Sequence, residues 1–279
     1  MKILNWIRAE HKIRRMVDKV YVDQPGRAEP VYDGIVNLKR YAAAPAKILW
    51  ILRETRDEAD TLAGGRLLCE DYFGITPVMQ LNQSTFQPII YITHGIFNRL
   101  FDYEQMPGVH ALPNAEDLVR SIALIYAKKL PGGPRGTPAA EILKWYRKGA
   151  DIIDRQIEAY GPEIIIGCSP HFPEIMSRAG IAKHLIRSHG SVAYAHFNGR
   201  LYVHVCHPGQ KQIIRSKYVN DVLQLIASEF SAARRSGRPA GRVNRAKLSK
   251  KRPDFIQLER SWWPLGGYAP DRRKLALAG

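Results

Sequence analysis

Four short apolar runs, each followed directly by polar residues, constrain the fold of this chain more than any other feature. They cover residues 47–52, 88–94, 163–170 and 201–208. A run of this length bounded by turn residues is typical of a strand buried on both faces, as in a parallel sheet. Asn198-Gly199 precedes the last run and predicts a hairpin with a further short strand at 192–196.

Segments with helical periodicity lie between these runs. They cover residues 115–129, 140–160, 172–187 and 217–230. Asn114 can cap the first of them, because Asn is favoured at helix N-termini. Strands that alternate with helices predict an α/β protein, a three-layer sandwich around a central, mainly parallel sheet.

Positive charge gathers at the two ends of the chain. The 279 residues include 42 Lys and Arg against 26 Asp and Glu, a net charge of +16. Residues 231–279 alone carry 13 basic and 3 acidic side chains. We therefore expect a basic helical N-terminal extension over 1–44, an α/β domain over 45–230, and a basic C-terminal tail with an aromatic cluster over 231–279. Such flanks favour DNA as a partner, because each neutralised phosphate releases a counterion. A solvated tail that only keeps the protein soluble is the alternative.

Composition excludes several classes of protein. No run approaches the roughly 18 to 20 apolar residues of a membrane span, and we expect no signal peptide. The three cysteines can form neither a disulfide framework nor an ordinary iron–sulfur site. Walker, dinucleotide-binding and G-x-S-x-G motifs are absent. We expect a cytoplasmic monomer that has no membrane attachment, metal or other cofactor.

Polar residues at the ends of the predicted strands form the candidate site. Ligands of open α/β sheets bind outside the carboxyl ends of the strands. We therefore expect five residues that are far apart in the sequence to lie near one another: Glu54, Asp57, His94, Ser169 and His207.

The same strand ends resemble motifs of the uracil-DNA glycosylase superfamily. The segment 53–57 (Arg-Glu-Thr-Arg-Asp) is similar in placement to the superfamily's G-[QE]-x-P type loop. Tyr91-Ile92-Thr93-His94 resembles an aromatic-I-T-N segment, and Ile164–Gly167 a strand that ends in glycine. His207-Pro208-Gly209-Gln210 resembles the His-Pro-Ser loop. The cluster cysteines of the iron–sulfur branch are missing, so the resemblance implies a divergent member without that cluster.

This resemblance implies a uracil-DNA glycosylase-like fold and hydrolysis of an N-glycosidic bond. Glu54 or Asp57 would stabilise the oxocarbenium-like sugar and orient the attacking water, and His207 would donate a hydrogen bond to the departing base. The remaining site residues divide by role. Base-binding residues would be Thr55, Tyr72, Phe73, His94 and Ser169. DNA-binding residues would be Arg53, Arg56, Gln210, Lys211, Arg234, Arg235, Lys250, Lys251 and Arg252.

His94 stands where the superfamily has a base-reading Asn. An imidazole offers one donor and one acceptor on opposite sides of its ring, whereas an amide offers them side by side. We therefore expect the substrate to be a flipped, modified pyrimidine rather than plain uracil, and the product to be an abasic site. Modified bases of phage DNA would suit such a site, which points to defence against phage.

Other interpretations of these residues stay open. Glu54 can pair with a neighbouring arginine at the surface, and Asp57 can cap the helix after the first strand. His94, Tyr72 and Phe73 can be core residues, and His207 can shape a turn. For the whole chain, the alternatives are a metal-dependent nuclease and a non-catalytic DNA-binding module with a degenerate glycosylase core.

Overall fold

A mixed sheet of seven strands runs through the described part of the chain, which comprises residues 2–22, 30–55, 83–112, 115–132 and 136–235 of a computed structural model. All of these residues belong to one unit, Met1–Val243, and a second unit, Asn244–Gly279, lies outside them. The strands are β1 (Gly34–Ile35), β2 (Ile48–Leu52), β3 (Ala123–Tyr126), β4 (Ile164–Gly167), β5 (Arg187–His189), β6 (Val192–Phe197) and β7 (Arg200–His204).

The strand order is β1-β3-β2-β4-β7-β6-β5, and the four central strands are parallel. β1, β6 and β5 extend the sheet with antiparallel pairs. The chain first passes from β2 to β3 on one side, and then crosses to β4 on the other side of β2. The carboxyl ends of β2 and β4 therefore flank a topological switch point, where ligands of open α/β sheets bind.

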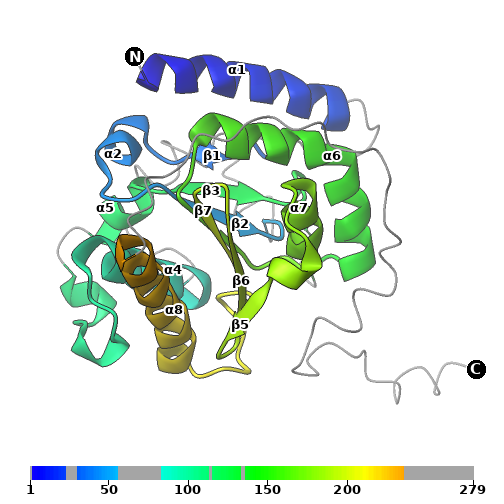
Figure 1. Cartoon of the computed structure of the whole chain (residues 1–279). Helices are drawn as coiled ribbons and strands as arrows, with labels where there is room; N and C mark the ends of the chain where they lie inside the picture. Colours follow the sequence, from blue (N-terminus) through cyan, green and yellow to red (C-terminus); the bar gives the residue numbers. More distant parts are fainter. Residues whose placement is uncertain (1, 23–29, 56–82, 113–114, 133–135, 236–279) are drawn as a thin grey trace, which may run out of the picture. The chain divides into compact units, whose positions relative to one another are not determined.

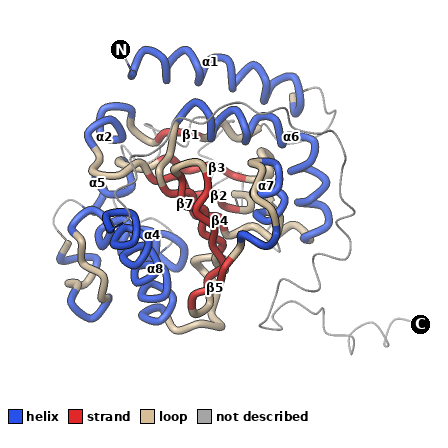
Figure 2. The backbone as a smooth tube through the Cα atoms, viewed as in Figure 1, coloured by secondary structure: helices blue, strands red, loops and turns tan. Residues whose placement is uncertain are grey.

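Helices cover both faces of this sheet (Figures 1 and 2). The helices are α1 (Lys2–Tyr21), α2 (Leu38–Ala43), α4 (Gln83–Asn98), α5 (Ala115–Arg120), α6 (Ala139–Tyr160), α7 (Phe172–Arg178) and α8 (Arg215–Arg235). Alternate residues of β2 enter two different cores, because successive side chains of a strand point to opposite faces. Trp50 packs with residues of α4 and α8, whereas Ile51 packs with residues of α6 and α7. No helix within the described residues is both long enough and apolar enough to cross a membrane.

The N-terminal helix α1 packs on α6 (Figure 1). Its residues Ile13 and Val17 are 2 % exposed and belong to the same core as α6. The indole N–H of Trp6 donates to the carbonyl of Ala159 at 3.1 Å, and the Tyr21 hydroxyl donates to the carbonyl of Trp145 at 3.3 Å. Residues 1–44 thus hold two helices and also β1, which pairs with β3 in the sheet.

Several sequence predictions are confirmed, including the α/β class. The runs at 47–52, 163–170 and 201–208 contain β2, β4 and β7, and residues 192–197 form β6. Asn198 and Gly199 have φ angles of 52° and 72° and join β6 to β7 as a tight hairpin. The helices predicted at 140–160 and 217–230 are α6 and α8. Gly161 ends α6 in the left-handed conformation, with φ of 60°.

The strand predicted at 88–94 is wrong, because these residues lie inside helix α4. An apolar run alone does not distinguish a buried strand from a buried helix. Ile89, Ile90 and Ile92 are all at most 1 % exposed, since α4 packs against both the sheet and α8. The helix has no broad polar stripe, and its sequence therefore resembles that of a buried strand.

The helices predicted at 115–129 and 172–187 are wrong over much of their length. Helix α5 ends at Arg120, and the apolar residues that follow form β3, an inner strand between β1 and β2. Helix α7 ends at Arg178 and is followed by the 3₁₀ turn η4 (Lys183–Leu185) and the edge strand β5. Asn114, the predicted cap, lies outside the described residues.

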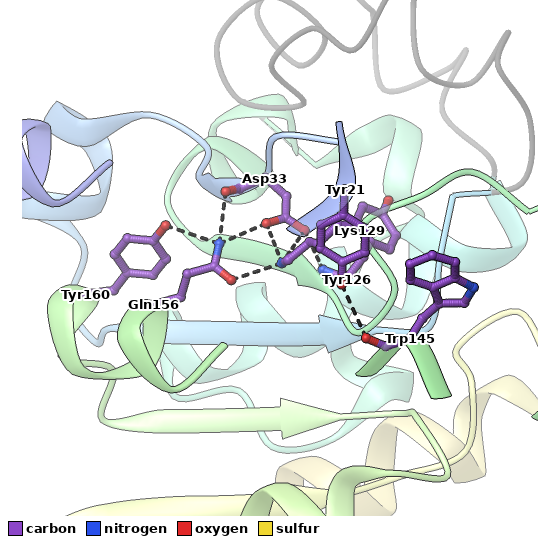
Figure 3. Close-up of polar contacts among 7 residues, drawn as sticks. All are labelled: Tyr21, Asp33, Tyr126, Lys129, Trp145, Gln156 and Tyr160. Carbon is purple, nitrogen blue, oxygen red and sulfur yellow. Dashed lines mark hydrogen bonds and ion pairs between the residues drawn. The ribbon is translucent and has the colours of Figure 1, made fainter. Parts of the chain in front are cut away.

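A buried ion pair joins β1, β3 and α6 (Figure 3). Lys129 Nζ lies 2.6 Å from Asp33 Oδ1 and 2.9 Å from Gln156 Oε1. The Gln156 amide donates to Asp33 Oδ1 at 2.8 Å, and the backbone N–H of Tyr126 donates to Asp33 Oδ2 at 2.6 Å. The side chains of Lys129 and Asp33 are both 1 % exposed. This network fixes the segment before β1 against the end of β3.

Candidate functional site

The carboxyl ends of β2, β4 and β7 bring three of the predicted site residues to neighbouring strand ends. Glu54 follows β2, Ser169 follows β4 and His207 follows β7. Parallel pairing continues just past the strands, because the N–H of Cys168 donates to Ile51 O at 3.0 Å and that of Val205 to Gly167 O at 2.9 Å. These three residues therefore emerge at the same edge of the sheet.

Glu54 is held in a buried ion pair with Lys128, which follows β3. Its Oε2 lies 2.9 Å from Lys128 Nζ, and its Oε1 accepts the backbone N–H of Thr137 at 2.6 Å. The two side chains are 7 % and 6 % exposed. Lys128 Nζ also donates to Thr137 Oγ1 at 2.7 Å and to Pro131 O at 3.1 Å. The partner of Glu54 is thus a lysine from the neighbouring strand, rather than an adjacent arginine at the surface.

Gly132 permits this arrangement, which leads to a first prediction. A Cβ at position 132 would lie 2.5 Å from the carboxyl carbon of Glu54, so Gly132→Ala must displace Glu54 from Lys128. We expect the free energy of unfolding to fall by about 1–3 kcal/mol, as for other overpacked sites. Urea unfolding measures it. Gly108→Ala is the control, because nothing lies within 4 Å of the added methyl group. Equal midpoints for the two variants would contradict the prediction.

His207 is fixed by the turn that follows β7. Its Nδ1 accepts the backbone N–H of Gly209 at 3.1 Å, and its carbonyl accepts the N–H of Gln210 at 2.9 Å. A ring nitrogen that accepts a backbone N–H carries no proton, so the neutral ring is assigned its proton at Nε2. The imidazole therefore has a hydrogen-bond donor on the side opposite to the turn.

The turn at Gly209 lies against the first turn of α4. A Cβ at Gly209 would lie 3.0 Å from Thr85 Oγ1 and 3.2 Å from Ser84 Oγ, so only glycine fits here without displacement. Gln210 Oε1 accepts the N–H of Ile213 at 2.8 Å, and its amide donates to the carbonyl of the same residue at 3.1 Å. The Gln210 side chain thus shapes its own loop, whereas Lys211 is exposed.

His94 lies elsewhere, because it belongs to α4 and follows no strand. It is ten residues beyond Ser84, about 15 Å along the helix axis at a rise of 1.5 Å per residue. Its Nδ1 lies 3.1 Å from the side-chain amide of Asn98, one turn further on. Burial lowers the pKa of the His94 imidazole. The strand whose end was expected to bring His94 to Glu54 and His207 is wrong, because residues 88–94 are helical.

His171 is a site residue that sequence analysis missed. It follows Ser169 after β4 and is 2 % exposed, and neither of its ring nitrogens has a hydrogen-bond partner among the described residues. Its ring stacks on Tyr146 of α6, with centroids 5.7 Å apart. Burial, together with the positive charges of Arg53 and Arg147, lowers the pKa of His171 to about 3. The signal available in the sequence was a polar side chain directly after the predicted run at 163–170.

Other buried polar atoms near the strand ends also lack partners among the described residues. They are the hydroxyl of Thr55 and Nε of Arg53, although the Arg53 guanidinium donates to Thr137 O at 2.8 Å. An unpaired buried polar group costs about 1–3 kcal/mol. Several such groups at one end of adjacent strands are therefore unusual and point to a site that receives a polar ligand group. Ser169 is completely buried, and its Oγ accepts the N–H of His171 at 3.4 Å.

The remaining predicted site residues cannot be placed at this edge. Arg234 and Arg235 are the last two residues of α8. Seven others lie outside the described residues: Arg56, Asp57, Tyr72, Phe73, Lys250, Lys251 and Arg252. Within the described residues, no three His, Cys, Asp or Glu side chains gather where they could hold a metal ion. No model of a protein family matches the chain, and no curated protein matches it either.

Proposed function

We propose that the protein is a DNA glycosylase that hydrolyses the N-glycosidic bond of a flipped, modified pyrimidine and leaves an abasic site. The observation that carries this proposal is the group of side chains at the switch point between β2 and β4 and at the adjacent end of β7. Among the described residues, Arg53, Thr55 and His171 have buried polar atoms without partners, and His207 is held at the adjacent strand end by the contact of its Nδ1 with Gly209. A nucleobase has the donors and acceptors that such atoms require.

The chemistry needs an electrostatic environment that is fixed before the reaction. Departure of the base leaves positive charge on the sugar and negative charge on the base. A carboxylate of the segment after β2, Glu54 or Asp57, would stabilise the sugar and orient water, and the His207 N–H would stabilise the departing base. Glu54 already accepts hydrogen bonds from Lys128 and Thr137. Glu54 therefore contributes to the structure of the loop, and the experiments below separate this contribution from a catalytic one.

Net positive charge supports DNA as the substrate class. An enzyme that acts on a base within a duplex must extrude the nucleotide, which costs a few kcal/mol. Contacts to the phosphates on either side can supply this energy. The chain carries an excess of 16 positive charges for such contacts. Defence against phage DNA with modified bases would be a role that fits this activity.

Base release from DNA is the test, and it gives a second prediction. The protein is incubated with DNAs that contain diverse modified pyrimidines, and free base and alkali-labile abasic sites are measured by mass spectrometry and gel electrophoresis. We expect His207→Ala to reduce the single-turnover rate by about 100- to 1000-fold, as the loss of one such donor does elsewhere. His196→Ala on β6 is the matched control, because this histidine is exposed and pairs with Leu201 near the start of β7, at the strand end opposite to His207.

The carboxylates are tested by Glu54→Gln and Asp57→Asn under the same conditions. A rate loss in Asp57→Asn with an unchanged unfolding midpoint would assign the water-orienting role to Asp57. A loss in Glu54→Gln that exceeds that of Gly132→Ala would assign the role to Glu54, because both changes disturb the ion pair with Lys128. Strand cleavage that a chelator abolishes would overturn the proposal in favour of a nuclease. Binding without any released base would favour a non-catalytic module.

A further inference from the structure

The outer face of α1 carries a straight row of cations. Arg8, Lys12, Arg15 and Lys19 are all exposed. Their spacing of four, three and four residues keeps them within about 60° of one another around a helix with 3.6 residues per turn. At 1.5 Å per residue the row is about 16 Å long. We call these four residues the α1 basic row.

The acidic residues of the same helix point away from this row. Glu10 is partly buried beside Tyr160, and Asp18 is partly buried and accepts a hydrogen bond from the Tyr32 hydroxyl. Among the described residues, no ion pair includes any member of the α1 basic row. Some other surface cations are paired: Arg155 contacts Glu158 at 2.9 Å, and Lys217 contacts Asp221 at 2.8 Å.

This arrangement does not serve the stability of the helix. Surface helices gain stability from opposite charges three or four residues apart, and like charges at that spacing reduce it. Arg8 and Lys12 form one such like-charged pair, and Arg15 and Lys19 form another. A row of uncompensated cations is instead what a polyanion requires, since each phosphate contact releases a bound counterion.

The opposite face of α1 is already occupied. Trp6, Ile13 and Val17 are buried against the rest of the protein, and α1 lies outermost over α6 (Figure 1). A helix that binds in a lipid interface needs its apolar face to be free. Of the apolar residues of α1, only Leu4 and Ile7 are more than a third exposed, at 60 % and 37 %. The row therefore favours a polyanion that is contacted through charge alone, and not a membrane.

We propose that the α1 basic row binds the phosphate backbone of DNA as a contact surface separate from the base-binding site. The identity of the polyanion rests on the proposed function, whereas the row itself does not. B-DNA has one phosphate charge per about 1.7 Å of its axis, so the row can face several phosphates at once. Because the contacts are to the backbone, they add affinity for any sequence and carry no base specificity.

The test compares DNA binding by the full chain and by a fourfold variant. Glutamine keeps helix propensity and removes charge, and the variant is Arg8→Gln, Lys12→Gln, Arg15→Gln and Lys19→Gln. Fluorescence anisotropy with an unmodified labelled duplex is measured over a series of salt concentrations. We expect at least about tenfold weaker binding at low salt, and a salt slope of log K shallower by about 3 to 4, since each lost phosphate contact removes about 0.9.

The matched control removes four exposed cations from other elements. These substitutions to Gln are at Lys39, Arg99, Lys183 and Arg187. We expect them to change the salt slope less than half as much. A slope in the fourfold α1 variant equal to that of the native protein, or equal to that of this control, would overturn the proposal. Binding of the native protein to vesicles rich in anionic lipid, lost in the α1 variant while DNA binding is kept, would also overturn it.

Base release separates failure of this inference from failure of the proposed function. If the protein excises a base, the α1 variant should show a raised KM and an unchanged kcat, because the row does not touch the reacting atoms. If no DNA yields a free base but the α1 variant still loses DNA affinity, the contact surface stands and the glycosylase proposal fails. If base release is normal in the variant at all DNA concentrations and binding is unchanged, only the α1 inference fails.

Discussion

Replacement of Lys129 by methionine is expected to lower the free energy of unfolding by about 3–5 kcal/mol, the usual cost of breaking a buried ion pair from one side. The change leaves the Asp33 carboxylate buried without its cation (Figure 3). Gln156 and the backbone of Tyr126 would still donate to it, but neither carries a positive charge. Urea unfolding at neutral pH, followed by circular dichroism, measures the loss.

Two further variants test the cause of this loss. Asp33→Asn in the Lys129→Met background removes the stranded charge, so we expect the double variant to be more stable than Lys129→Met alone. An equal or larger loss would show that packing, and not the buried charge, is responsible. Arg178→Met breaks two comparatively exposed pairs, with Asp154 and with Asp151, in which the Arg178 side chain is 37 % exposed. We expect this control to cost no more than about 1 kcal/mol.

Acid is expected to destabilise the protein through two buried histidines. Burial lowers the pKa of His204 to about 4 and, together with nearby positive charges, that of His171 to about 3. Both rings stay neutral in the folded protein but bind protons below pH ~6.5 once unfolded. The unfolded state therefore binds more protons, and stability falls as pH decreases from about 6.5 towards 4. Each histidine contributes about 1.4 kcal/mol per pH unit in this range.

Glu10 has the opposite effect on stability, because its contribution increases on acidification. Burial raises the pKa of its carboxyl group to about 7, so the folded protein holds a proton there that the unfolded chain has lost. This contribution is fully present below pH ~4.5 and disappears as pH rises through 7. Between pH 6.5 and 4.5 it offsets about half of the effect of the two histidines. We expect a net loss of roughly 2–3 kcal/mol on acidification over this range.

His171→Phe isolates one histidine from these opposing effects. Phenylalanine keeps a ring beside Tyr146 and removes two buried nitrogens that have no partner. We expect stability at pH 7 to be unchanged or higher, and the acid loss to be smaller by about 1.4 kcal/mol per pH unit. Tyr146→Phe removes a buried hydroxyl that has no partner among the described residues. It does not titrate in this range, so the loss of stability on acidification should stay the same. Identical urea midpoints for native protein and His171→Phe at every pH would contradict this account.

The same variant relates stability to function. If His171 receives a polar group of the substrate, His171→Phe should lose base release while its fold becomes no less stable. Such a trade is common where buried polar groups are kept for a ligand rather than for the fold. A fully active His171→Phe would instead mean that a buried water molecule satisfies the ring.

The sequence alone predicted those elements in which the local pattern and the flanking turn signals agree with the tertiary structure. β2, β4 and β7 are apolar runs between turn signals, and the hairpin before β7 follows from Asn198-Gly199. Helix α6 has a strong helical period and ends at Gly161. Patterns of this kind depend on residues that are near in sequence, and they also placed Glu54, Ser169 and His207 at strand ends.

Only the tertiary structure decided the two segments that were interchanged, α4 and β3. Both are apolar on nearly every side, because α4 is covered by the sheet and α8 and β3 lies inside the sheet, so neither shows a period that reveals its type. Because the sequence did not predict β3, it also did not indicate that Lys128 is the partner of Glu54. Which strand lies beside which is set by contacts between distant residues. Local sequence can therefore indicate that a residue ends a strand, but the side chain that it meets there depends on the packing of the whole sheet.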